Sequence, residues 1–277
     1  MKTAIVQHII KWNNLEWNLK HLEALMDLQP GCDLYVLAET FATGFMAEGT
    51  TAMAGEQSQR IFGWMQQQAS QRDAAIAGSV ATMDDEGRLR NRLFFVRPDG
   101  THEFYDKRHL FGFAGETDEY VAGERRMVIT WRGVRFLLQI CYDLRFPVFS
   151  RNRGDYDAII YVANWPGRRR AVWQTLLRAR ALENQCYVVG VNRVGSDKAC
   201  DYMGDSMILD AYGNISAWCK DSVEGVAAAE LDMEELQRFR DKFPVLGDAD
   251  EFTCATANPD ARRQGNGRQG GHSKIRD

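Results

Sequence analysis

The feature that most constrains the fold is the alternation of short apolar runs with segments of helical period. The apolar runs are rich in Val, Ile and Leu, which favour strands. They comprise residues 3–10, 33–38, 73–81, 92–96, 135–140, 157–164, 186–194 and 225–232. Between several of them, apolar side chains recur every three or four residues, as on one face of a helix. These are Leu15, Leu19, Leu22 and Met26, then Ile61, Trp64, Met65 and Ala69, then Val172, Leu176 and Ala179. Strands that alternate with helices predict a layered α/β fold.

Two further patterns refine this prediction. The segments "RPDGT" (97–101) and "DAYGNI" (210–215) are typical of turns between adjacent strands, so the sheet is expected to be mixed. From Thr253 onward the chain lacks aromatic and nearly all large apolar residues, which predicts a disordered tail over residues 253–277. The tail contains "GNGRQG", but no strand precedes this segment and no helix follows it, so it does not indicate a dinucleotide site.

The net charge and the pattern of cysteines indicate which binding partners and which cellular compartment to expect. A net charge of −4 offers no field that would gather phosphates, so we expect a small-molecule partner and no nucleic acid. The six cysteines form no CxxC pair and no metal-binding pattern, which favours reduced thiols in the cytoplasm. No apolar run has the length of a membrane span or the form of a signal peptide, so no membrane association is expected.

Three reactive residues follow strand-like runs. Cys141 ends the run 135–140, Glu39 ends the run 33–38, and Lys107 follows "THEFYD". If these strands are neighbours, their ends converge and bring a nucleophile, a carboxylate and a cation within reach of one another. Taken singly, each residue also fits an ordinary role, the cysteine in packing and the other two at the surface or in an ion pair.

Together, these segments resemble a known family. The blocks "LAETFATGF" (37–45), "YDKRHLF" (105–111) and "ICYDLRFP" (140–147) resemble the glutamate, lysine and cysteine motifs of the nitrilase superfamily of carbon–nitrogen hydrolases. The resemblance extends over about residues 2–252 and is greatest to the bacterial omega-amidases. It implies one domain over residues 1–252, with a four-layer α-β-β-α sandwich, and a homodimer or higher homo-oligomer.

The resemblance also implies roles for the site residues. Cys141 would attack the carbonyl carbon of an amide, and Glu39 would act as the general base that takes the thiol proton. Lys107 and the backbone N–H of Tyr142 would stabilise the oxyanion of the tetrahedral intermediate. Glu116 would hold Lys107 and the substrate amide in position, although an exposed acid in a charged loop is an alternative for this residue.

Several residues near these motifs are candidates for substrate recognition. Arg145 is the candidate for binding a distal carboxylate, with a structural ion pair as the alternative. Phe41, Phe113 and Trp165 are expected to narrow the pocket, unless they are ordinary core residues. The run Arg168–Arg170 has the character of a solvated helix start.

Ala38 and His109 lie within the glutamate and lysine motifs. The family usually has proline before its glutamate, whereas this chain has Ala38, which leaves the backbone less constrained and adds an N–H group. We expect this difference to adjust activity without abolishing it. His109, two residues after the lysine, is interpreted as a structural hydrogen-bonding group because Glu39 already provides a base.

The implied activity is the hydrolysis of short 2-oxo dicarboxylic acid monoamides, 2-oxoglutaramate and 2-oxosuccinamate, through a cysteine thioester and without a metal or an organic cofactor. The alternatives are an N-carbamoyl amino acid or amine amidohydrolase and a scaffold protein that keeps the fold without turnover, and nitrile hydrolysis is disfavoured.

We predict that truncation after Phe252 leaves catalytic activity and melting temperature unchanged, because the tail lacks the apolar groups needed to dock on a domain. Thermal unfolding and an assay of amide hydrolysis, run on the full and the truncated chain, measure these two quantities. A clear fall in either quantity would contradict the prediction of a disordered tail.

Overall fold

The computed structural model describes residues 1–12, 14–45 and 50–254, which form two six-stranded sheets and a two-stranded ribbon. In spatial order, the first sheet contains β14 (Gly225–Glu230), β1 (Lys2–Gln7), β2 (Leu34–Val36), β3 (Ala75–Met83), β4 (Leu89–Val96) and β5 (His102–Asp106). The second contains β13 (Ile215–Trp218), β12 (Met207–Leu209), β9 (Tyr187–Asn192), β8 (Ala158–Ala163), β7 (Val134–Ile140) and β6 (Val128–Trp131). The ribbon pairs β10 (Val194–Ser196) with β11 (Asp201–Met203).

The two sheets share one pairing pattern. Strands β1, β2 and β3 run parallel at the centre of the first sheet, and β7, β8 and β9 do so in the second. The remaining strands of each sheet pair antiparallel on either side of this centre. The predicted mixed character is therefore confirmed, and the turns at 97–101 and 210–215 join the antiparallel pairs β4–β5 and β12–β13.

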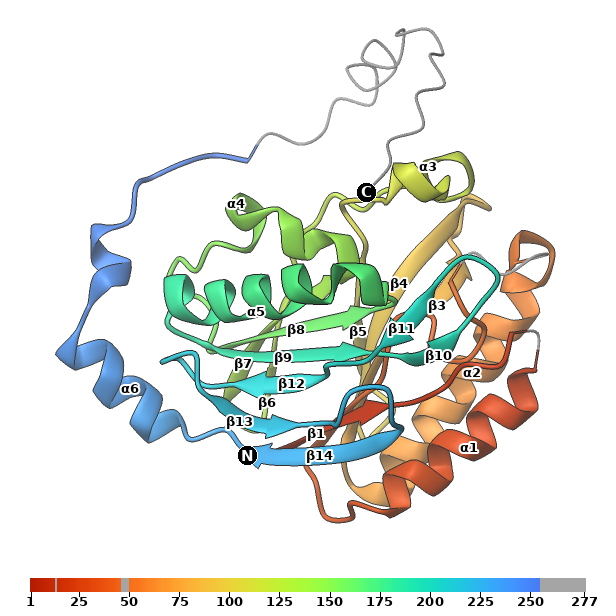
Figure 1. The fold of residues 1–277 in the computed structure, drawn as a ribbon, viewed down its shortest axis with the longest axis horizontal. Coiled ribbons are helices and arrows are strands. Elements are labelled where there is room, and N and C mark those ends of the chain that lie inside the picture. Colours follow the sequence, from red (N-terminus) through yellow and green to blue (C-terminus); the bar gives the residue numbers. More distant parts are fainter. Residues whose placement is uncertain (13, 46–49, 255–277) are drawn as a thin grey trace, which may run out of the picture.

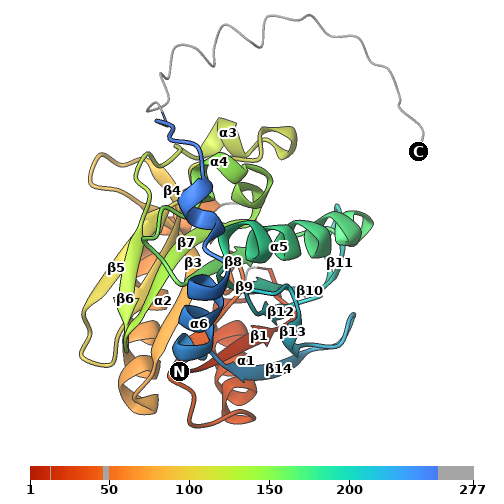
Figure 2. The same cartoon turned by 90° about the vertical axis from the view of Figure 1, so that its left-hand side faces the viewer.

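Helices cover the outer faces of the sheets. Figures 1 and 2 show α1 (Leu15–Asp27) and α2 (Thr50–Arg72) on one side of the molecule and α5 (Arg170–Asn184) on the opposite side, with the strands between them. Helix α2 packs on β3, and α5 packs on β9. This is the predicted α-β-β-α sandwich. Shorter helical segments connect the strands, and α6 (Met233–Lys242) follows β14. None of the helices in the described ranges is long and apolar enough to cross a membrane.

The buried face of helix α5 differs from the one that the sequence pattern predicted. The structure buries Trp173, Leu177 and Ala181, whereas the sequence pattern favoured the stripe that begins one residue earlier, at Val172. Both stripes have helical spacing, and the opposing surface decides between them. Gly190 of β9 lacks a side chain, and a Cβ atom placed there would come within 2.5 Å of Leu177 and 3.2 Å of Trp173.

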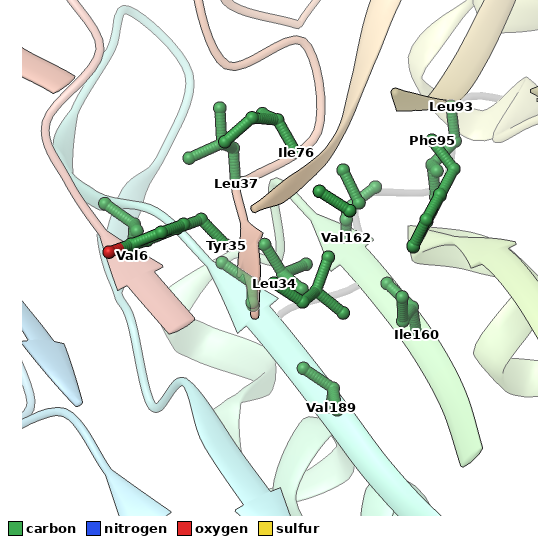
Figure 3. Close-up of a cluster of buried hydrophobic side chains, with 14 of the residues drawn as sticks. Val6, Leu34, Tyr35, Leu37, Ile76, Leu93, Phe95, Ile160, Val162 and Val189 are labelled. Carbon is green, nitrogen blue, oxygen red and sulfur yellow. The ribbon is translucent and has the colours of Figure 1, made fainter. Parts of the chain in front are cut away.

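The main core lies between the two sheets. Figure 3 shows Leu34, Leu93 and Phe95 of the first sheet in one cluster with Ile160, Val162 and Val189 of the second. All residues of β8 and β9 are buried, because these central strands are covered on both faces. The predicted tail beginning at Thr253 stays a prediction, since residues 255–277 lie outside the described part of the chain.

A buried histidine connects β1 to the loop that follows β2. His8 is fully buried, and its Nε2 lies 3.0 Å from the carbonyl oxygen of Phe41. Burial lowers the pKa of His8 from 6.5 to about 4, although the carbonyl groups of Phe41 and Val6 oppose this shift. His8 is therefore neutral in the folded protein at neutral pH.

We predict that His8 makes the folded state lose stability in acid. Between pH 6.5 and about 4 the unfolded chain takes up a proton at this residue and the folded chain does not. The free energy of unfolding should therefore fall by up to about 3 kcal/mol as the pH decreases through this range. Denaturant unfolding at several pH values measures the slope. His8→Asn should flatten it, and the exposed His102→Asn serves as the matched control. Equal slopes in the His8 variant and the wild type would contradict the prediction.

Candidate active site

The ends of four strands meet where the two sheets face each other. Glu39 lies in the loop after β2, Lys107 directly follows β5, Cys141 directly follows β7, and Asn164 directly follows β8. The first two strands belong to one sheet and the last two to the other. The structure thus brings the three residues that sequence analysis singled out into one cluster.

The loop that carries Glu39 is fixed by contacts with β3. Thr40 has a φ of 43°, in the left-handed region, and its N–H donates to Ser79 Oγ at 2.9 Å. The ring of Phe41 packs on Gly78, where a Cβ atom would approach it to 2.7 Å. Phe41, which the sequence analysis assigned to the substrate pocket, is fully buried in this core and does not line the cavity beside Cys141.

Lys107 lies between two carboxylates. Its Nζ donates to Glu39 Oε1 at 2.8 Å and to the two carboxylate oxygens of Glu116 at 3.0 and 2.9 Å. All three side chains are at most 1% exposed. Burial acts to lower the pKa of Lys107, but the charges of Glu116 and Glu39 outweigh it and hold that pKa well above its usual value. Lys107 therefore stays charged.

Glu116 is the first residue of the short helix α3 (Glu116–Glu119). Its Oε2 accepts from the backbone N–H of Phe111 at 2.6 Å. Burial raises the pKa of Glu116, and the charge of Lys107 opposes that shift. The structure places Glu116 at the ammonium group of Lys107, whereas its neighbour Asp118 is exposed.

Two asparagines, which sequence analysis did not assign to the site, orient the carboxylates. Asn91 of β4 donates through Nδ2 to Glu39 Oε1 at 2.8 Å and to Glu116 Oε1 at 3.2 Å. Asn164 donates its backbone N–H to Glu39 Oε2 at 2.8 Å. Asn164 lies in the segment "YVANWP" at the end of an apolar run, a position that could have indicated it. For Asn91, the sequence offered one indication, namely a polar residue within the segment that forms strand β4.

The candidate nucleophile, Cys141, lies on a strained turn. Cys141 has a φ of 45° and begins the 3₁₀ segment η2 (Cys141–Arg145), a conformation that costs energy in a residue with a side chain. Asp143, fully buried, stabilises the turn by accepting from the Ile140 N–H at 3.0 Å and from the Tyr105 hydroxyl at 2.8 Å. It also accepts from the backbone N–H of His109 at 3.0 Å, and its Oδ1 lies 2.7 Å from His109 Nδ1. His109 therefore connects the lysine and cysteine segments, in agreement with its predicted structural role.

The thiol of Cys141 is protonated in this environment. Burial raises its pKa, the charge of Glu39 raises it further, and the charge of Lys107 opposes both, so that the pKa lies well above its usual value. The sulfur also lies 4.0 Å from the carbonyl oxygen of Asn164. A neutral thiol beside a carboxylate is the arrangement needed for general-base activation of a nucleophile.

Cys141 opens onto a cavity of about 250 Å³. Its lining is largely apolar and aromatic, and includes Trp12, Phe45, Phe111, Ala114, Tyr142, Trp165, Pro166, Ala199 and Tyr202. Tyr142, Arg145 and Trp165 thus lie where the sequence analysis placed substrate-binding residues. Phe113 is 81% exposed and does not belong to the lining.

Two arginines, Arg145 and Arg169, line this cavity. The guanidinium of Arg145 lies 5.2 Å from the centre of the Trp165 ring, and neither Arg145 nor Arg169 forms an ion pair with any residue that the structure describes. The segment 168–170 leads into helix α5, which agrees with the expected helix start, and Arg168 is exposed. Arg169 faces the cavity, and Arg170 is paired with Asp205 at 2.7 Å. Among the described residues, no group of three or more His, Cys, Asp or Glu side chains could hold a metal ion.

Comparisons with known proteins agree with this geometry. The model of the carbon–nitrogen hydrolase family matches residues 2–241. The chain is 46% identical to omega-amidase YafV of Yersinia enterocolitica over 91% of its length and 98% of that protein. It is 31% identical to 2-oxoglutaramate amidase of Bacillus subtilis over 88% of its length and 96% of that protein.

A solved structure extends the comparison. XC1258 from Xanthomonas campestris, a CN-hydrolase superfamily protein with an arsenic adduct in its active site, superimposes with a TM-score of 0.88. That protein is 38% identical to this chain, and the match covers 92% of this chain and 99% of XC1258.

We predict that Glu116→Gln lowers kcat by about tenfold or more while the melting temperature changes little, because Lys107 then loses one of the two charges that orient it. Steady-state kinetics and thermal unfolding measure the two quantities. Asp118→Asn, an exposed change two residues away, is the control and should behave as wild type. Equal activity in both variants would show that Glu116 has no part in orienting Lys107.

Proposed function

Because this chain belongs to the carbon–nitrogen hydrolase family, we propose that it is an omega-amidase, which converts 2-oxoglutaramate and 2-oxosuccinamate to the 2-oxo acid and ammonia. The observation that carries the proposal is the meeting of a protonated thiol, a carboxylate and a fixed cation beside a small cavity that Cys141 lines together with two arginines, neither of them in an ion pair with a described residue. The names of the matched relatives, omega-amidase and 2-oxoglutaramate amidase, support the choice of substrate.

The first half of the reaction forms a thioester. The Cys141 sulfur bonds to the amide carbon while its proton passes to Glu39, and the carbonyl oxygen becomes an oxyanion. Collapse of this tetrahedral intermediate breaks the C–N bond, and the nitrogen leaves as ammonia with the proton that Glu39 had received. The hydrogen bonds from Asn91, Asn164 and Lys107 keep the Glu39 carboxylate in one orientation throughout.

The second half hydrolyses the thioester. Glu39 takes a proton from water, the hydroxyl oxygen bonds to the acyl carbon, and the C–S bond breaks to return the protonated thiol. Lys107 and the backbone N–H of Tyr142 stabilise the oxyanion of both intermediates, and removal of one such donor typically costs about 3 kcal/mol. Glu116 holds the ammonium group of Lys107 in place.

The substrate end is recognised by Arg145. A short omega-amide of a 2-oxo acid carries a carboxylate at the end opposite the amide, and a guanidinium matches a carboxylate with two hydrogen bonds. Arg145 lies four residues after the nucleophile and lines the same cavity. The structural ion pair, which was the alternative for this residue, is absent among the described residues.

We also propose the setting in which the enzyme works. The six cysteines are all free in the structure, which supports function in the reducing cytoplasm. A homodimer or larger homo-oligomer is proposed on the basis of the family resemblance.

A substrate panel tests the proposed function. We predict that ammonia release is fastest with 2-oxoglutaramate and 2-oxosuccinamate and slow with N-carbamoyl amino acids and nitriles. Cys141→Ala should lose this turnover and keep the wild-type melting temperature, because a small side chain replaces a group whose role is chemical. Preference for an N-carbamoyl compound would move the assignment to that reaction. Turnover by Cys141→Ala would exclude the thioester, and inactivity of the wild type on every compound would favour a scaffold.

A further inference from the structure

We propose that Arg169 is a second anion-binding residue of the cavity, and that it acts with Arg145 on the 2-oxo acid end of the substrate. The inference rests on the proposed function and adds the residue that makes the site selective for a 2-oxo acid.

The three consecutive arginines at 168–170 have different environments. Arg168 is exposed, and Arg170 forms ion pairs with Asp205 at 2.7 Å and with Asp221 at 3.4 Å. Arg169 is partly buried at the end of the 3₁₀ segment η3 (Gly167–Arg169) and lines the cavity. The structure therefore directs one of the three charges into the cavity and leaves it without a carboxylate among the described residues.

The acidic residue in the lining does not neutralise the two arginines. Asp197 Oδ1 accepts from the backbone N–H groups of Ala199 and Cys200 at 2.8 and 2.9 Å. Its Oδ2 accepts from the Tyr202 hydroxyl at 2.7 Å and lies 3.9 Å from the buried Arg193 Nη1. The Asp197 side chain is 5% exposed. The Asp197 carboxylate is therefore engaged by groups of the β10–β11 ribbon and by Arg193.

Aromatic rings position both guanidinium groups. Arg145 comes from η2 and lies 5.2 Å from the Trp165 ring centre, and Arg169 comes from η3 and lies 5.5 Å from that of Phe111. Stacking of a guanidinium on a ring leaves the N–H groups at its edge available to a ligand. The cavity thus offers two separate, pre-positioned sets of donors.

The ligand chemistry follows from this arrangement. A 2-oxo carboxylate presents three oxygen acceptors in or near one plane, which is one more than an ordinary carboxylate presents. Two guanidiniums can satisfy all three oxygens, whereas one bidentate guanidinium satisfies two. A 2-amino acid such as glutamine would place an ammonium group beside the same two cations and be repelled.

The test compares amides that differ at the far end. We predict that Arg169→Gln lowers kcat/KM by about tenfold or more for 2-oxoglutaramate, mainly through KM, because a charged hydrogen-bonded contact is lost. The loss should be smaller for glutaramate, which lacks the 2-oxo oxygen, and negligible for the neutral pentanamide. Arg168→Gln is the matched control and should leave all three values near wild type.

Activity on the neutral pentanamide distinguishes a role of Arg169 in substrate binding from a purely structural role. Arg169 also packs on Phe111, whose N–H donates to Glu116, so a purely structural role would slow pentanamide as much as 2-oxoglutaramate. An equal fractional loss of kcat/KM on both amides, which would leave the ratio of the two values unchanged, would overturn the proposal.

A binding measurement makes the outcome independent of turnover. The starting variant is Cys141→Ala, and two double variants add either Arg169→Gln or Arg168→Gln to it. In calorimetric titration with 2-oxoglutarate, Arg169→Gln should raise the Kd by about tenfold, whereas Arg168→Gln should leave it unchanged. If wild type fails to hydrolyse 2-oxo amides but this difference in Kd persists, the proposed function is wrong and the anion site remains. If the Kd is equal in the two double variants, the Arg169 proposal is wrong whatever the enzyme hydrolyses.

Discussion

The contact of Lys107 with Glu39 and Glu116 places one cation and two carboxylates where the sheets meet, with each side chain at most 1% exposed. Removal of such ions from water costs several kcal/mol each, and is tolerated only where attraction and hydrogen bonds replace hydration. Asn91, Asn164 and the N–H of Phe111 supply those bonds. The surrounding loops must therefore hold their conformations for the charges to be satisfied.

Burial and the negative charge of this cluster together set the protonation state of the Cys141 thiol. With two carboxylates and one ammonium group nearby, and with burial as the largest cause, the pKa of Cys141 is raised. In the proposed mechanism, a thiol therefore lies beside its base, and the thiolate develops only as the sulfur approaches the substrate carbon.

Charge changes sign between the catalytic cluster and the rest of the cavity lining. The cluster carries one surplus negative charge, and Arg145 and Arg169 carry positive charge that no described residue neutralises. Under the proposed function, an amide with an anionic far end is attracted by the arginines and repelled by the carboxylates, which orients its neutral amide toward Cys141. The same field opposes the reversed orientation, which would place a carboxylate at the nucleophile.

The sequence by itself determined the layered fold and the positions of Glu39, Lys107 and Cys141, because strand and helix periods are local and these residues directly follow strand-like runs. Tertiary structure decided the rest. Asn164 contacts Glu39 across 125 residues of sequence, and no local pattern encodes such a contact. Residues with identical local character, such as Arg168, Arg169 and Arg170, or the two possible stripes of α5, were separated only by what lies opposite them: an open cavity, Asp205, or the bare backbone of Gly190. Packing between distant segments thus selects among side chains that the local sequence leaves equivalent.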